Sequence, residues 1–146
     1  MLVRALFVVA VVAVALVLGL WWRSRQGVVR VSAPDVVTPA PSDADEVWRG
    51  RGVQLAGTAT FVQFSTEHCS PCRATPRVLG ALVAQRDDVS HREMDIDQNL
   101  DLVRRFSVLR APTVLVLDRD GREVARMTGA VGRAQAEQAL AAVAGV

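Results

Sequence analysis

The residues of this chain best suited to chemistry are its only two cysteines, Cys69 and Cys72. They are two residues apart and follow an apolar run, 61–64, that is typical of a strand. A Cys-x-x-Cys pair placed where a strand gives way to a helix indicates a dithiol redox centre. At the first turn of a helix one sulfur can be exposed with the other within disulfide reach, and unpaired backbone N–H groups favour the thiolate. The spacing predicts Cys69 as the attacking sulfur and Cys72 as the resolving sulfur.

Other interpretations of the two cysteines have less support from the sequence. A purely structural disulfide is disfavoured, because so short a loop constrains little of the unfolded chain. A zinc site would need His68 and His91, but His68 directly precedes Cys69 and His91 falls on an expected strand. The alternative that stays open is a non-enzymatic binding or metal-delivery module whose dithiol holds a soft ion such as Cu(I).

The elements that must position the pair follow from the hydrophobic pattern. Strands are predicted over residues 58–65, 89–94, 113–117 and 123–127, with a hairpin turn at 118–121. Helices are predicted over residues 71–85, 98–106 and 132–143. Strands separated by helices early and a hairpin late indicate an α/β domain whose mixed central sheet has helices on both faces. The helix at 98–106 is expected to present Leu100, Val103 and Phe106 to the core.

From about residue 58 onwards the chain resembles thioredoxin, through the Cys-Ser-Pro-Cys motif and the Arg-Ala-Pro-Thr run at 110–113. The resemblance implies a thioredoxin fold and a thiol:disulfide oxidoreductase that exchanges electrons with protein disulfides and with an upstream redox partner. It implies no bound cofactor beyond the redox-active disulfide. It also implies a cis peptide before Pro112, beside the dithiol. The catalytic residues would be Cys69, Cys72 and Pro112, and the substrate-binding residues Ala111, Pro112, Ser70 and Pro71.

Several positions depart from the thioredoxin pattern. Gln63 stands where the family usually buries a carboxylate behind the second sulfur, so proton transfer at Cys72 needs another route. Glu93 replaces a common lysine, and Pro76 lies one residue before the expected helix proline. His68, next to the first cysteine, has no assigned role. The missing acid predicts slower general disulfide reduction and a narrower range of partners.

The N-terminal part of the chain has a different composition. Residues 5–22 form an 18-residue uncharged, mostly apolar run, about the minimum that spans a bilayer. Residues 13–15 mimic a signal-peptidase site, but more apolar sequence follows them, which favours an uncleaved transmembrane helix. The predicted organisation is a transmembrane anchor at 1–23, a proline-containing juxtamembrane tether at 24–42 and a thioredoxin-like domain at 43–146. Within the tether, 28–31 could form a short edge strand.

The arginines that flank the apolar run predict its orientation. Arg4 precedes the run, whereas Arg23, Arg25 and Arg30 follow it. The positive-inside rule therefore favours a single-pass protein of the cell membrane whose domain faces the cytoplasm. The thioredoxin resemblance favours the opposite orientation, since related anchored proteins often face outward. An extracytoplasmic domain is therefore the alternative. A net charge of +2 gives no argument for a nucleic-acid partner, and a monomer is expected.

Overall fold

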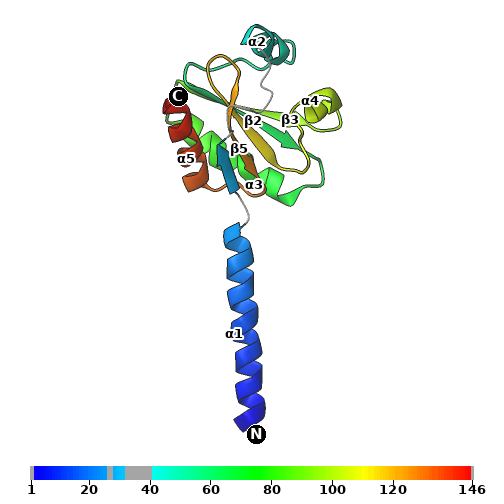
Figure 1. Cartoon of the computed structure of the whole chain (residues 1–146), viewed down its shortest axis with the longest axis vertical. Helices are drawn as coiled ribbons and strands as arrows, with labels where there is room; N and C mark the ends of the chain where they lie inside the picture. Colours follow the sequence, from blue (N-terminus) through cyan, green and yellow to red (C-terminus); the bar gives the residue numbers. More distant parts are fainter. Residues whose placement is uncertain (1, 26–27, 32–40, 146) are drawn as a thin grey trace.

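A five-stranded mixed sheet forms the centre of the molecule (Figure 1). The computed structural model describes residues 2–25, 28–31 and 41–145, with side chains for residues 4, 6–21 and 43–145. The strands are β1 Val28–Val31, β2 Ala59–Ser65, β3 Val89–Asp95, β4 Thr113–Leu117 and β5 Glu123–Thr128. Their order in the sheet is β1-β5-β4-β2-β3, and only β2 and β3 run parallel. The predicted mixed sheet is therefore confirmed.

Helices cover both faces of this sheet, as the pattern predicts. They are α2 Pro41–Arg49, α3 Ser70–Val83, α4 Leu100–Arg105 and α5 Arg133–Ala144. Side chains of α3 and α5 share one apolar core with Phe61, whereas α2 and α4 share the other core with Val62. Successive strand residues point to opposite faces. Gln63, two residues after Phe61, therefore lies on the α3 face.

Trp48 anchors α2 to the second core. Its indole Nε1 donates to the Gly121 carbonyl over 3.0 Å, and its ring stacks on Phe106 with centroids 4.9 Å apart. Gly121 has a φ of +77°, and a Cβ there would meet the indole at 3.0 Å. The hairpin turn between β4 and β5 therefore needs glycine both for its backbone conformation and for contact with Trp48.

The helix predicted at 98–106 is shorter than expected, and two of its three predicted core residues, Val103 and Phe106, pack in the second core. It begins at Leu100 and ends at Arg105, and Leu102 supplies its buried contact, with Phe106 just beyond. Leu100 is exposed, so the prediction that it faces the core is wrong. Leu100 is the first helical residue, where the chain has only just turned out of the preceding loop, and regular helical spacing does not yet fix which way its side chain faces.

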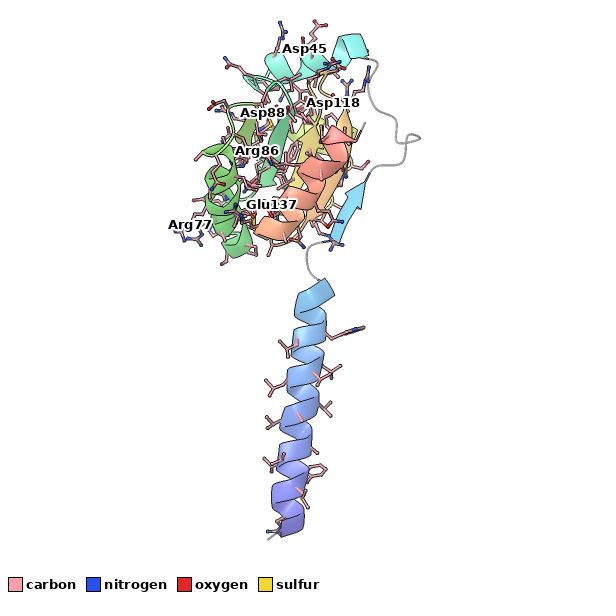
Figure 2. The ribbon with its side chains drawn as sticks, turned by 90° about the vertical axis from the view of Figure 1, so that its left-hand side faces the viewer. Asp45, Arg77, Arg86, Asp88, Asp118 and Glu137 are labelled. Atoms are coloured by element: carbon pink, nitrogen blue, oxygen red, sulfur yellow. A yellow bond between two sulfur atoms is a disulfide. The ribbon has the colours of Figure 1, made fainter. Side chains whose placement is uncertain are left out.

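The N-terminal segment is a helix, α1 Leu2–Arg25, followed by β1. Figures 1 and 2 show α1 extending away from the sheet, and its large apolar side chains are exposed. Among the described residues, no helix combines the length and apolar character needed to cross a membrane. Strand β1 lies inside the predicted 24–42 tether, yet it pairs with β5 from Val28↔Thr128 to Val31↔Ala125. Residues 32–40 of that tether are outside the described residues.

Candidate active site

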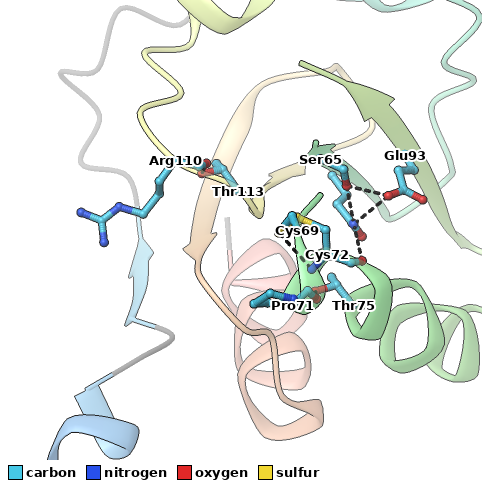
Figure 3. The surroundings of a disulfide bond; sticks show 9 residues. Ser65, Cys69, Pro71, Cys72, Thr75, Glu93, Arg110 and Thr113 are labelled. Atoms are coloured by element: carbon cyan, nitrogen blue, oxygen red, sulfur yellow. Dashed lines mark hydrogen bonds between the residues drawn. A yellow bond between two sulfur atoms is a disulfide. The ribbon is translucent and has the colours of Figure 1, made fainter. Parts of the chain in front are cut away.

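The dithiol lies where β2 gives way to α3, as predicted. Cys69 is the N-cap of α3, and it forms a disulfide with Cys72 in the first helical turn (Figure 3). The Cys72 N–H lies 3.2 Å from Cys69 Sγ and 3.1 Å from the Cys69 carbonyl oxygen. Cys69 is half-buried, whereas only 2% of Cys72 is exposed. The more accessible cysteine is therefore the one predicted to attack, and it receives a helix N-terminal N–H at its sulfur.

The loop before β4 approaches the dithiol from a distant part of the sequence. Thr113 pairs with Phe64 next to the end of β2, which brings the residues before Thr113 to the edge where the cysteine turn begins. The Ala111–Pro112 peptide is cis, as the resemblance implies. Its geometry is held on both sides, because Thr113 Oγ1 donates to the Arg110 carbonyl over 2.8 Å and the Gly129 N–H donates to the Pro112 carbonyl over 2.8 Å.

The predicted substrate-binding residues differ in exposure. Ser70 and Pro71 lie exposed between the two cysteines, Ala111 is half-buried and Pro112 is buried. Just before them, 89% of Leu109 is exposed. The accessible helix turn therefore lies at the disulfide itself, and Leu109 is an exposed apolar side chain in the loop before β4. His68 is exposed in the loop that precedes the first cysteine.

Behind the second cysteine lies a fully buried amide, Gln63. Its Nε2 donates to the Cys72 carbonyl over 3.1 Å and to Ser65 Oγ over 2.7 Å, and it lies 3.1 Å from Glu93 Oε1 (Figure 3). Ser65 Oγ in turn donates to Glu93 Oε1 over 2.6 Å. On the other side of the amide, Gln63 Oε1 lies 3.2 Å from His91 Nε2. The expectation that position 63 lies behind Cys72 is confirmed, and the nearest carboxylate stands on the neighbouring strand.

The predictions from the sequence do not assign Ser65 and Glu93 to one cluster with Gln63. The period of two along β2 places Ser65 on the same face as Gln63, and this signal is readable in the sequence. The pairing of Gln63 with Glu93 depends on the parallel register between β2 and β3. Nothing within either strand alone specifies that register.

Burial lowers the pKa of His91, and the nearby Glu93 carboxylate opposes this shift only in part. Between the lowered value and the unfolded value of about 6.5, the unfolded chain binds a proton that the folded protein does not. The free energy of unfolding should therefore rise with pH through this window and fall on acidification. We expect His91→Gln, which keeps a donor but does not titrate, to reduce this dependence in urea unfolding measured between about pH 5 and pH 7.

The control for this prediction is His68→Gln, because His68 is exposed. It should leave the slope of stability against pH as it is in the unmodified protein. An unchanged slope in His91→Gln would contradict the prediction.

Known proteins share the fold, and the family match covers the residues of this site. Residues 51–144 match the family model described as "Thioredoxin-like domain". Over 75 residues the chain is 36% identical to thioredoxin of Mycobacterium bovis, covering 51% of this chain and 64% of that protein. It is also 36% identical over 75 residues to thioredoxin of Chlamydia trachomatis, covering 51% of this chain and 72% of that protein. The match to the mycobacterial relative thus spans less than two thirds of that relative's length.

Solved structures agree with these matches. The X-ray structure of Fasciola hepatica thioredoxin is 26% identical, with a TM-score of 0.55 over 68% of this chain and 90% of that one. Thioredoxin from Trypanosoma brucei brucei, at 23% identity, shares the fold with a TM-score of 0.56 over 68% of this chain and 87% of that chain. With its Cys69–Cys72 disulfide at the start of α3, the chain belongs to the thioredoxin-like domain family.

Proposed function

We propose that this chain is a thiol:disulfide oxidoreductase that exchanges electrons with protein disulfides through Cys69 and Cys72. The observation that carries the proposal is the pairing of an accessible N-cap cysteine with a buried cysteine one turn on, whose N–H points at the first sulfur. This arrangement favours the thiolate at the position that a partner can reach. Membership of the thioredoxin-like family supports the same chemistry.

In the reducing direction the Cys69 thiolate attacks one sulfur of the partner disulfide. A bond forms between Cys69 and that sulfur, and the partner's other sulfur leaves as a thiolate and takes up a proton. Cys72, after losing its proton, then attacks Cys69 Sγ. The Cys69–Cys72 bond forms, the bond to the partner breaks, and the released sulfur takes up a proton. Two electrons have passed to the partner, and an upstream dithiol reductant must return them. The reverse sequence would oxidise a partner.

The test uses the full chain in detergent micelles. We expect it to accelerate the reduction of insulin by dithiothreitol, and no acceleration would overturn the proposal. A parallel Cu(I) titration covers the alternative of a metal-delivery module, which tight Cu(I) binding without insulin reduction would favour. The reduction potential then gives the direction of electron flow, since a value near about −270 mV is typical of a reductase and one near about −120 mV of an oxidant.

The proposal extends to location, where α1 would hold the protein at the cell membrane as a single-pass anchor. The support is the uncharged run at 5–22 in the sequence, whose ends at Ala5 and Trp22 lie outside the described side chains. The large apolar side chains between them are exposed, among them Leu6, Phe7 and Leu20. An apolar surface on all sides of a helix is typical of a segment in contact with lipid.

The flanking arginines lead us to expect a cytoplasmic domain. A reporter that is active only outside the cytoplasm, fused after Val146, should be inactive in the unmodified protein. Moving Arg23, Arg25 and Arg30 to the N-terminal flank should invert the orientation and activate the reporter. Reporter activity in the unmodified protein would place the domain outside the cytoplasm instead. Extraction of the protein from membranes by alkaline carbonate would contradict the anchor itself.

A further inference from the structure

Helix α3 contains a proline, Pro76, one turn after the second cysteine. In an α-helix the N–H of residue 76 would donate to the carbonyl of residue 72. Proline has no N–H, so this bond is missing. The carbonyl that loses its helix partner is that of Cys72, the predicted resolving cysteine, and this residue is almost fully buried.

Gln63 supplies a donor to this carbonyl. Its Nε2 reaches the Cys72 carbonyl oxygen over 3.1 Å from the facing strand β2. The amide has two hydrogens, and Ser65 Oγ at 2.7 Å accepts the other. Glu93 Oε1 does not need a hydrogen from the amide, because the Ser65 hydroxyl already donates to it over 2.6 Å. Each polar group around the amide therefore has a partner.

The surroundings also fix which way the amide points. The groups around Nε2 are a carbonyl, a carboxylate and a hydroxyl that itself donates to that carboxylate, whereas Oε1 faces His91 Nε2 at 3.2 Å. The opposite orientation would place the amide oxygen against the carbonyl and the carboxylate oxygens. An ionised carboxylate at position 63 would face the same acceptors and could not donate to Cys72. An amide is thus suited to this position in a way that an ionised acid is not.

We propose that Gln63 is a positioning residue for Cys72, which replaces the backbone hydrogen bond that Pro76 removes from α3. The two residues act as a matched pair: the proline frees the carbonyl of the resolving cysteine, and the glutamine binds it. The inference rests on the proposed function for the role of Cys72. It assigns to Gln63 a task other than proton transfer.

The effect should depend on redox state. In the disulfide form the Cys69–Cys72 bond itself holds the first turn of α3. In the dithiol form that link is absent, and the hydrogen bond from Gln63 holds the backbone of Cys72 in place. Loss of the bond should therefore destabilise the dithiol form more than the disulfide form. It should also misplace Cys72 for its attack on the mixed disulfide.

The experiment compares Gln63→Met, Pro76→Ala and the double variant in the full chain. Gln63→Met removes the donor with little change in length. We expect it to shift the dithiol–disulfide equilibrium in a glutathione buffer about tenfold toward the disulfide, and to lengthen the lifetime of the mixed disulfide by a similar factor. Pro76→Ala restores an N–H for the Cys72 carbonyl. In the Pro76→Ala background, the same Gln63→Met change should therefore have a much smaller effect.

Gln85→Met is the control, because it makes the same replacement at an exposed glutamine just after α3 and should change neither quantity. Equal effects of Gln63→Met with and without Pro76, or no effect at all, would overturn the inference. If Gln63→Met does not fold, the double variant should fold, and failure of both would count against the pairing. The glutathione equilibrium needs no protein substrate. An unmodified protein that cannot reduce insulin would therefore overturn the proposed function and leave this measurement to decide the role of Gln63.

Discussion

Cys69→Ser is expected to abolish disulfide exchange, whereas Cys72→Ser is expected to trap partners as stable mixed disulfides. The reason is the difference in access between the two residues, since Cys69 is half-buried at the N-cap of α3 and only 2% of Cys72 is exposed. Without Cys69 no sulfur can reach the partner disulfide. Without Cys72 the first bond forms, but no thiolate follows to break it.

Non-reducing electrophoresis after incubation with a disulfide-bonded protein measures this outcome. Cys72→Ser should give a higher-mass species that dithiothreitol removes, and Cys69→Ser should not. Because the chain has only these two cysteines, the double serine variant is the matched control and should capture nothing. Equal alkylation of the two thiols in the reduced protein, or capture by Cys69→Ser, would contradict the assignment.

The parts of the fold that the sequence predicted well are those with strong local patterns. The near-continuous apolar run at 113–117 predicts strand β4 at its observed bounds, because a strand buried on both faces is largely apolar. The Cys-Ser-Pro-Cys motif predicts the start of α3 to within one residue, because proline is favoured at the first positions of a helix. The hairpin at 118–121 followed from its turn residues.

Other features depend on contacts between distant segments, which local patterns do not specify. The short edge strand expected at 28–31 is confirmed as β1, but four residues alone do not identify β5 as its partner. The same holds for the contacts around the Gln63 amide, because Glu93 lies beside Gln63 only through the register of β2 against β3. The sequence does indicate the missing hydrogen bond in α3, because Pro76 lies four residues after Cys72 and has no N–H to donate to the Cys72 carbonyl. The replacement donor, Gln63, could not be identified from the sequence, because it lies on the facing strand β2.

A second large effect is expected from Arg126, which connects β5 to the turn after α4. Its Nε and Nη2 donate to the Glu123 carboxylate over 2.7 and 2.8 Å, and Nη2 also donates to the Phe106 carbonyl over 2.7 Å. The side chains are well shielded, with 4% of Glu123 and 19% of Arg126 exposed. That turn includes Ser107, which has a φ of +49°, and leads into the loop of Pro112. Arg126 thus holds a strained turn next to the predicted substrate-binding loop.

We expect Arg126→Met to lower the free energy of unfolding by about 3–5 kcal/mol, because it removes the cation paired with the shielded Glu123 carboxylate and a donor to the Phe106 carbonyl. Urea unfolding of the variant and the unmodified protein measures this. Arg133→Met is the matched control, since it breaks an exposed pair with Glu137 and should cost less than about 1 kcal/mol. Equal losses of stability in the two variants would show that burial of the Arg126–Glu123 pair adds nothing to the free energy of unfolding. If Arg126→Met stays folded at low denaturant, its rate of disulfide exchange should also fall, because the turn that leads to Pro112 has lost its support. An unchanged rate would show that this turn does not contribute to substrate binding.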